Sequence, residues 1–210
     1  MRQAPVVLAT FLAVLAFPGI ARSQTNPPPP TIWTAGPDSV RPAKWAVKLE
    51  RPGLPNLHIV TTNLYRGAQP TVRGMKELKT MGVKTVINLR SFHSDDDEAR
   101  GLGLKLQRLH MKPWHSEEED VIVFLKAVAD TNNYPIFVHC QRGADRTGLV
   151  CAMYRVVCEG WTKPEAIQEL KDGGYNFDTR WKNIPRYIEQ ADVEALKRKA
   201  GMIPVEPANP

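Results

Sequence analysis

The chain has 210 residues, of which 42% are hydrophobic and 24% charged; this suits one globular domain or two small ones and excludes a disordered or fibrous protein. Its 28 basic and 22 acidic side chains give a formal charge of +6, which is modest for a nucleic-acid-binding protein and suits an anionic ligand. Its three cysteines cannot all pair, which excludes a disulfide scaffold.

The first 23 residues have the pattern of an export signal. Arg2 supplies a positive start, residues 6–17 are apolar, and small residues three apart precede a cleavage point after Ser23. A membrane anchor is the alternative, but crossing a bilayer takes about 20 apolar residues. We therefore expect residues 1–23 to be removed on export, leaving a periplasmic or secreted protein with no segment inserted in the membrane.

A proline-rich segment follows the signal. Residues 24–43 contain the run Pro27–Pro30 together with Pro37 and Pro42, a composition that favours extended polyproline geometry over packing. We expect this segment to be a linker, residues 44–203 to form a single domain, and residues 204–210 to be a flexible tail.

Strand and helix patterns alternate along the expected domain. In chain order they predict a strand at 63–66, a helix between 71 and 82, strands at 83–89 and 104–109, a helix after the polar loop 112–119, a strand at 136–138, and helices at 147–159, 163–172, 181–189 and 191–200. The acidic residues 95–98 are predicted to open a short helix. This order predicts an α/β domain with a central, largely parallel sheet of about four to five strands flanked by helices, and a helical C-terminal layer.

The strand at 136–138 runs directly into the most informative segment, which reads His139-Cys140-Gln141-Arg142-Gly143-Ala144-Asp145-Arg146-Thr147-Gly148. A loop between the carboxyl end of a strand and the start of a helix turns successive backbone N–H groups inward and forms a nest for an anion. Five residues between Cys140 and Arg146 let the chain curl once around a tetrahedral dianion, and Gly143 permits close backbone approach. The amides of the five residues Gln141 to Asp145 are therefore the predicted phosphate ligands.

The side chains of this loop suggest a nucleophile and its supports. The positive field of the amides and helix should lower the pKa of Cys140 and keep it a thiolate. Arg146 offers a planar fork that can hold two phosphate oxygens at once. The Thr147 hydroxyl can donate to the thiolate and help it leave. His139 follows an apolar strand, so we expect it to be buried and to brace the loop.

Other charged and sulfur-containing side chains near the loop leave alternatives open. An acid beside a bound dianion is unfavourable, so Asp145 is expected to face outward to a basic neighbour. Arg142 either recruits a second phosphate or an acidic peptide, or pairs with Asp145. Cys151 and Cys158 lie on the following helix among apolar residues and are expected to be buried. A redox link from one of them to Cys140 is the alternative.

The pattern His-Cys-x5-Arg-Thr-Gly between a strand and a helix resembles the cysteine-dependent protein tyrosine phosphatase superfamily. Residues 63–70 (Asn-Leu-Tyr-Arg-Gly-Ala-Gln-Pro), 82–89 and 153–160 followed by Trp161 are similar to its compact dual-specificity branch, and most of all to exported, periplasmic bacterial members. The resemblance extends over residues 60–190. It implies a tyrosine-phosphatase-like fold and attack of Cys140 on phosphorus, giving a phosphocysteine that water hydrolyses without a metal or other cofactor.

The resemblance also implies a carboxylic acid that protonates the leaving group, placed on the loop before the helix that precedes the nucleophile strand. That loop is Pro113–Asp120 (Pro-Trp-His-Ser-Glu-Glu-Glu-Asp), where the exported members have Pro-x-His-small-Asp. Glu117 takes the place of that Asp and is the first choice for the general acid, with Asp120 second and Asp95–Asp97 as a rival site. The alternative is that these acids only stabilise a helix N-terminus. Trp114 is expected to shield the pocket or to lie in the core.

The residues predict hydrolysis of phosphomonoesters, and several interpretations of the substrate stay open. Phosphotyrosine in proteins, with phosphoserine or phosphothreonine, is the first. The second is the same chemistry on inositol polyphosphates or phosphoinositides, which the acidic Asp145 in the loop disfavours. A catalytically silent phospho-binding module is disfavoured by the intact Cys140, Arg146 and Thr147, and arsenate reduction by the lack of a resolving thiol near the site. We expect a monomer that does not bind nucleic acid.

Overall fold

The computed structural model describes residues 41–112 and 117–203. The expected signal, most of the expected linker, the expected tail and Trp114 lie outside these residues. None of the helices in the described ranges is both long and apolar enough to cross a membrane.

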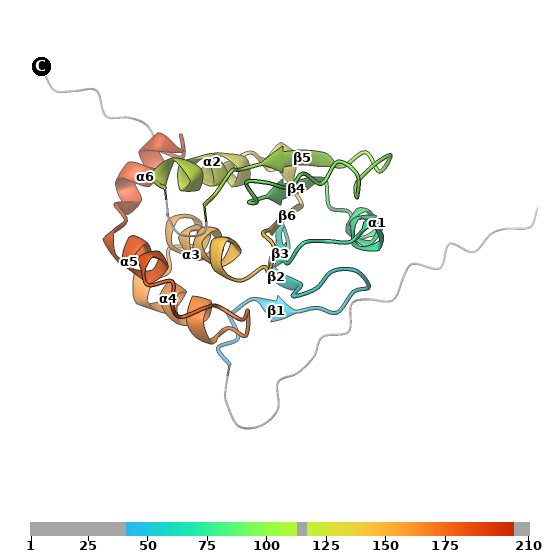
Figure 1. The fold of residues 1–210 in the computed structure, drawn as a ribbon. Coiled ribbons are helices and arrows are strands. Elements are labelled where there is room, and N and C mark those ends of the chain that lie inside the picture. Colours follow the sequence, from blue (N-terminus) through green and yellow to red (C-terminus); the bar gives the residue numbers. More distant parts are fainter. Residues whose placement is uncertain (1–40, 113–116, 204–210) are drawn as a thin grey trace, which may run out of the picture.

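A six-stranded sheet forms the centre of the domain (Figure 1). Its strands are β1 (Val47–Lys48), β2 (His58–Thr61), β3 (Leu64–Gly67), β4 (Thr85–Asn88), β5 (Lys105–Arg108) and β6 (Ile136–His139), in the order β1-β2-β3-β6-β4-β5. The pairs β3–β6, β6–β4 and β4–β5 are parallel, whereas β1–β2 and β2–β3 are antiparallel. The predicted α/β class and largely parallel sheet are confirmed. The sheet has two more strands than the sequence patterns located: β1 has two residues, too few to show a period of two, and β2 was not recognised.

Six α-helices accompany the sheet. They are α1 (Val72–Thr80), α2 (Glu118–Ala129), α3 (Asp145–Cys158), α4 (Lys163–Asp172), α5 (Asn183–Gln190) and α6 (Val193–Lys199), with the 3-10 turn η1 (Thr131–Asn133) after α2. Each lies close to a predicted helix. The short helix predicted at 95–98 is wrong: the amide of Ala99 donates to the carbonyl of Asp95 at 2.9 Å, but the turn does not continue as a helix. The side chain of Asp95 is engaged elsewhere, as described below.

Two hydrophobic layers hold the sheet between the helices. In β6, Ile136 and Val138 pack in the layer under α2 to α6, whereas Phe137 packs in the layer under α1. Side chains of a strand alternate between faces, so β6 is buried on both sides. The helix α3 lies against the sheet with α2, α4, α5 and α6 around it (Figure 1). This arrangement fixes the loop that joins β6 to α3.

The two cysteines of α3 have different environments. Cys151 is buried in the main core, as predicted, and burial raises its pKa to about 11. Cys158 was predicted to be buried as well, but it is exposed. It is the last residue of α3. Neither thiol is in a disulfide in the structure.

Candidate active site

The Cys140–Ala144 segment, called here the phosphate loop, joins the end of β6 to the start of α3. β6 lies between β3 and β4, and the three strands run parallel. The carboxyl ends of parallel strands meet at one edge of a sheet, which is where open α/β folds bind ligands. The loop therefore lies at the centre of that edge, directly before the amino end of a helix.

Each carbonyl of the phosphate loop is engaged by the surrounding protein. The Cys140 carbonyl lies 3.2 Å from His139 Nδ1. The Gln141 carbonyl accepts a hydrogen bond from the Gln69 amide at 3.3 Å, and the Ala144 carbonyl accepts one from the Gly148 amide at 2.7 Å. Two side chains reach the carbonyls between them: Asn56 Nδ2 donates to Arg142 at 3.0 Å and Arg66 Nη2 donates to Gly143 at 2.9 Å. With its carbonyls held in this way, the loop can turn amides toward its centre. The amides of Arg142 and Thr147 do so, since both donate to the Cys140 sulfur. Two amides thus point toward the sulfur, and phosphate binding by the amides of residues 141–145 stays a prediction.

Gly143 meets two independent requirements for glycine. Its φ of +68° is in the left-handed region, which side chains with a Cβ rarely adopt. A Cβ at this position would also lie 2.4 Å from the carbonyl carbon and oxygen of Gly67 and 2.5 Å from the amide nitrogen of Ala68. The phosphate loop therefore packs directly on the backbone at the end of β3.

Cys140 is buried at the base of the loop. Burial by itself raises the pKa of its thiol, but hydrogen bonds from the hydroxyl and amide of Thr147, the charge of Arg146 and the amide of Arg142 outweigh burial. The net effect lowers the pKa of Cys140, as predicted for a nucleophilic thiolate. No nitrogen or oxygen among the described residues engages the buried Thr147 hydroxyl, which leaves it to the sulfur.

The guanidinium of Arg146 is half-buried beside the loop. Its Nη1 donates to the carbonyls of Leu89 at 3.2 Å and Met111 at 3.3 Å, which follow β4 and β5. Two backbone anchors on one nitrogen fix the orientation of the planar group. The remaining N–H groups of the fork can then meet phosphate oxygens.

A buried histidine–carboxylate pair lies behind the loop. His139 Nε2 donates to Asp95 Oδ2 at 2.9 Å, and Gln69 Nε2 donates to Asp95 Oδ1 at 2.7 Å. Burial tends to raise the pKa of Asp95, but the bonds from His139 and Gln69 give a net lowering. A carboxylate kept ionised, with a donor on each oxygen, is a poor source of protons. Asp95 therefore holds His139 and Gln69 in place, and His139 is buried as predicted.

Arg142 and Asp145 pair with each other, which is one of the two alternatives open for Arg142. Arg142 Nη2 lies 2.7 Å from Asp145 Oδ2, and the Arg142 side chain is 57% exposed. Asp145 Oδ1 accepts from the amide of Asp178 at 3.0 Å. The acid thus pairs with a basic neighbour, as expected, but the expectation that it faces outward is wrong, because it is buried and covered by the segment before α5.

The two first candidates for the general acid differ in environment at the start of α2. Glu117, at the N-cap, forms an ion pair with Lys112 at 3.2 Å and makes no side-chain capping bond. Asp120 lies one turn later, and its Oδ2 has no hydrogen-bond partner among the described residues. Burial, together with the charges of Glu117 and Glu119, raises the pKa of Asp120. A raised pKa favours the protonated form that a proton donor requires.

Sequence reasoning missed the residues that hold the loop from outside. Arg66 is buried in β3 and lies 3.7 Å from the centre of the Tyr175 ring, while it donates to Gly143. Asn56 Nδ2 bonds the carbonyls of both Arg142 and Tyr175. A charged residue at an inward position of a strand is the one available signal, and it applies only to Arg66.

Within the described ranges, a single group of side chains is close enough to share a metal ion. It consists of His93, Asp95 and Glu98, whose ligand atoms lie within 4.8 Å of one another. His93 Nε2 lies 3.2 Å from Glu98 Oε1, and Asp95 serves His139 and Gln69 as described above. These contacts account for the cluster as part of the support of the loop.

Comparison with known proteins gives consistent matches. The family described as "DSP-PTPase phosphatase fused to NAD+ Kinase" matches residues 58–181. The dual specificity protein phosphatase TpbA of Pseudomonas aeruginosa is 34% identical over 163 residues, which cover 76% of this chain and 72% of TpbA. The inositol diphosphatase DSP5 of Arabidopsis thaliana is 28% identical over 153 residues, covering 69% of this chain and 73% of DSP5.

A similar solved structure is that of P. aeruginosa TpbA in complex with pTyr. It matches with a TM-score of 0.68 and 28% identity, over 77% of this chain and 98% of that chain. The structure of the Siw14 catalytic core matches with a TM-score of 0.63 and 21% identity, over 73% of this chain and 94% of that one, and is similar in fold.

Proposed function

Because the chain belongs to the dual-specificity branch of the cysteine-dependent protein tyrosine phosphatases, we propose that it hydrolyses phosphotyrosine in proteins. Phosphoserine and phosphothreonine are expected as further substrates. The observation that carries the proposal is the buried Cys140 thiol at the start of α3, which accepts hydrogen bonds from Thr147 and from the Arg142 amide and lies beside the Arg146 guanidinium, itself anchored by the carbonyls of Leu89 and Met111. A relative with pTyr bound supports the substrate class.

The reaction proceeds in two steps. The Cys140 thiolate attacks phosphorus in line with the ester oxygen, which leaves, and a phosphocysteine forms. The charge on the phosphoryl oxygens is met by the loop amides and by Arg146, which are already in place before substrate binds. Water then attacks phosphorus, and the Cys140 sulfur leaves as a thiolate stabilised by Thr147.

The leaving tyrosinate needs a proton, and we assign the donor to Asp120. Its raised pKa and its unpartnered Oδ2 suit a general acid, whereas Glu117 is engaged by Lys112. The same carboxylate would activate the water in the second step. Asp120→Asn should lower kcat on phosphotyrosine about 100-fold and remove the alkaline descending limb of the pH–rate profile. 4-Nitrophenyl phosphate, whose leaving group departs without a proton, should be affected much less.

Glu117→Gln is the matched control for this assignment. It removes one carboxylate from the same turn and should keep both limbs of the profile. If Glu117→Gln loses the alkaline limb and Asp120→Asn keeps it, the proton donor is Glu117.

Hydrolysis of a phosphotyrosine peptide without added metal tests the main proposal. Cys140→Ser should lower kcat by about a thousandfold or more, while Cys158→Ser, which alters an exposed thiol of α3, should leave it unchanged. Full activity in Cys140→Ser would overturn the mechanism. A wild-type protein that binds phosphotyrosine but hydrolyses nothing would be a phospho-binding module instead.

Inositol phosphates are a second candidate substrate class, because some relatives act as inositol diphosphatases. The pairing of Arg142 with Asp145 lowers the positive charge available to a second phosphate group. Release of inorganic phosphate from matched panels of phosphopeptides and inositol polyphosphates compares the two classes. A higher kcat/KM for the inositol polyphosphates would replace the peptide assignment.

We also propose that residues 1–23 direct export and are cleaved, so that the enzyme acts in the periplasm or outside the cell. The support is the sequence pattern of a positive start, an apolar run and small residues before Ser23. Amino-terminal sequencing of the protein recovered from the periplasm and the medium tests this, with Gln24 as the expected first residue. Retention of the full chain inside the cell would contradict it.

A further inference from the structure

The strand β5 is the free edge of the sheet on the side away from β1 (Figure 1). Toward β4, the amide of Lys105 donates to Lys84 and that of Leu109 to Asn88, each at 2.8 Å. Backbone groups alternate in direction along a strand, so the N–H and C=O groups of Leu106 and Arg108 point away from β4. No described strand pairs with that side, so it is available for an added strand.

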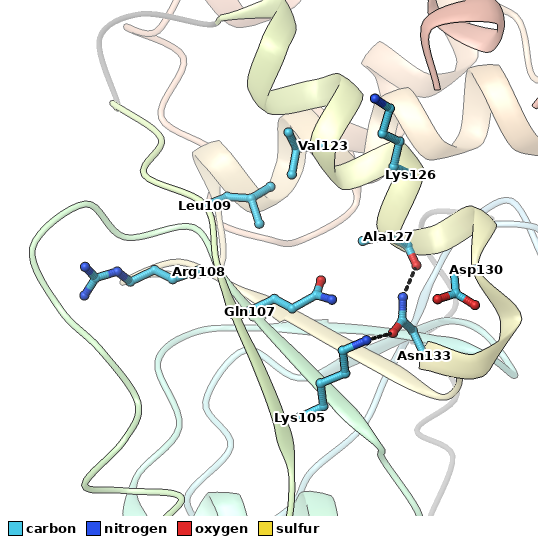
Figure 2. A pocket seen from close by; sticks show the side chains of 9 residues that line it. All are labelled: Lys105, Gln107, Arg108, Leu109, Val123, Lys126, Ala127, Asp130 and Asn133. Atoms are coloured by element: carbon cyan, nitrogen blue, oxygen red, sulfur yellow. Dashed lines mark hydrogen bonds between the residues drawn. The ribbon is translucent and has the colours of Figure 1, made fainter. Parts of the chain in front are cut away.

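A hollow of about 470 Å³ lies beside this edge, between β5 and α2 (Figure 2). Leu109, Ala127 and Val123 give it an apolar part, and Val123 is 50% exposed. Lys105 and Lys126 are the cations at its side, and Lys105 Nζ is held by Asn133 Oδ1 at 2.7 Å.

The charge of this hollow is positive. Lys105 and Lys126 supply this charge, since the side chain of Arg108, although it lines the hollow, is directed away from it (Figure 2), and Asp130 is the one acid among the lining residues. Asp130 Oδ1 is used by the amide and side chain of Asn132, in the cap of η1. Within residues 41–112 and 117–203, neither Arg108 nor Lys126 has an acidic partner. Acidic side chains of a ligand would give these two cations the opposite charge that they lack.

A second hollow, of about 220 Å³, lies along the same strand and is lined by Leu106, Gln107 and Arg108 together with Asn88, Ser94, Asp95 and Asp96. Because it holds two acids, only the first hollow favours the acidic side chains of a ligand. Leu106 packs in the layer of α1, whereas Leu109 packs in the layer of α2, so the two hollows lie on opposite faces of the sheet. Figure 2 shows the Arg108 side chain directed away from the first hollow. An added strand projects alternate side chains to opposite faces, which fits a free edge with a hollow on each side.

The edge leads toward the active site. The carbonyl of Met111, three residues beyond β5, accepts a hydrogen bond from Arg146 Nη1. An extended chain advances about 3.3 Å per residue. An added strand beside β5 lies three strand spacings, about 14 Å, from β6 and the phosphate loop that follows it, so a residue about four to eight positions from that strand can reach the loop.

From these observations we propose that the β5 edge and its basic hollow bind an acidic segment of the substrate protein as an added strand. The phosphorylated residue lies on the same chain, outside the added strand. The proposal rests on the proposed function, because it assigns the feature of a phosphoprotein that this phosphatase selects.

The first experiment compares two phosphotyrosine peptides, one with glutamates four to eight residues from the phosphotyrosine and one with glutamines there. Lys105→Glu combined with Lys126→Glu should raise KM for the glutamate peptide about tenfold. Hydrolysis of the glutamine peptide and of 4-nitrophenyl phosphate should change less than twofold. Arg108→Glu with Lys126→Glu is a second variant that keeps the Lys105–Asn133 bond and should act in the same direction.

Lys76→Glu with Lys79→Glu is the matched control, because it makes the same charge change at two exposed lysines of α1. It should leave KM for both peptides unchanged. An equal rise in the control would mean that net charge, not the β5 edge, attracts acidic peptides, and would overturn the proposal. Equal kcat/KM of the two peptides on the wild-type protein would also overturn it.

The backbone part of the proposal has its own test. N-methylation of every second amide in the acidic segment should raise KM when the methylated amides face β5 and not when the pattern is shifted by one residue. An equal effect of both patterns would refute an added strand.

Binding of the unphosphorylated glutamate peptide to Cys140→Ser, followed by fluorescence anisotropy, tests docking without catalysis. Peptide binding to Cys140→Ser, together with a wild-type protein that hydrolyses no phosphopeptide, would leave docking intact and refute the proposed function. We expect this binding to be lost when Lys105→Glu and Lys126→Glu are added to Cys140→Ser. If Cys140→Ser with an unchanged β5 edge does not bind the peptide, the docking proposal is overturned and the proposed function is not.

Discussion

Replacing Gly143 by alanine should disable the phosphate loop while the domain stays folded. The new Cβ would lie 2.4 Å from the carbonyl of Gly67, where carbon contacts normally begin near 3.5 Å, so the loop must retreat by about 1 Å. Gly67 cannot move in its place because it is in register with His139 in the sheet. A misplacement of about 1 Å in a catalytic group can reduce the rate about 100-fold. We therefore expect kcat/KM on a phosphotyrosine peptide to fall about 100-fold.

The energetic part of this prediction has a control in the same chain. Gly160 has a φ of +69°, next to +68° for Gly143, but a Cβ there would meet nothing within 4 Å. Gly160→Ala isolates the left-handed strain, of about 1 kcal/mol, and should lower the Tm by about 2–4 °C without loss of activity. Gly143→Ala adds overpacking of about 1–3 kcal/mol. Activity of Gly143→Ala within threefold of wild type would refute the close-packing argument.

Three further predictions concern the groups around the loop. Asp95→Asn leaves one acceptor for two donors, His139 and Gln69, and should cost about 1–3 kcal/mol in urea unfolding at pH 7. Because folding lowers the Asp95 pKa, the stability it gives is present above pH 4 and is lost in acid; an Asp95→Asn protein with the wild-type acid limb would contradict this. Thr147→Ala should raise the Cys140 pKa and slow its alkylation by iodoacetamide at pH 6; an unchanged rate would remove Thr147 from thiolate stabilisation. Glu169→Gln removes one of the two carboxylates that pair with the buried Arg155 and leaves Glu159 at 2.6 Å; it should destabilise the fold by about 1–3 kcal/mol, and a Tm within 2 °C of wild type would argue against the pair.

The choice of the general acid shows what a sequence pattern can predict and what it cannot. The sequence pattern favours Glu117 as the proton donor, but it says nothing about how solvent reaches the carboxyl group. The fold half-buries Asp120 and gathers the charges of Glu117 and Glu119 around it, which raises its pKa. The choice between the two carboxyls depends on these surroundings, because protonation at neutral pH follows from desolvation and neighbouring charge.

Other differences between prediction and structure have the same origin. Asp95 was considered as a proton donor because it follows a strand that ends near the site. Its carboxylate instead accepts from His139, which is 44 residues away in the chain. Cys158 was expected to be buried because its sequence neighbours are apolar, but it is the last residue of α3 and is exposed.

The sequence by itself determined the phosphate loop, since its nucleophile, its glycine, its arginine and its threonine are consecutive parts of one strand–loop–helix unit. The order of strands and helices also determined the α/β class, because buried strands and helices each leave a periodic pattern. Tertiary structure alone decided what holds the loop open: Arg66 and Asn56 reach its carbonyls from 77 and 86 residues away. It also decided which edge of the sheet stays free. Partners so distant in the chain leave no local pattern, because their contact energy is gained only after the chain has folded.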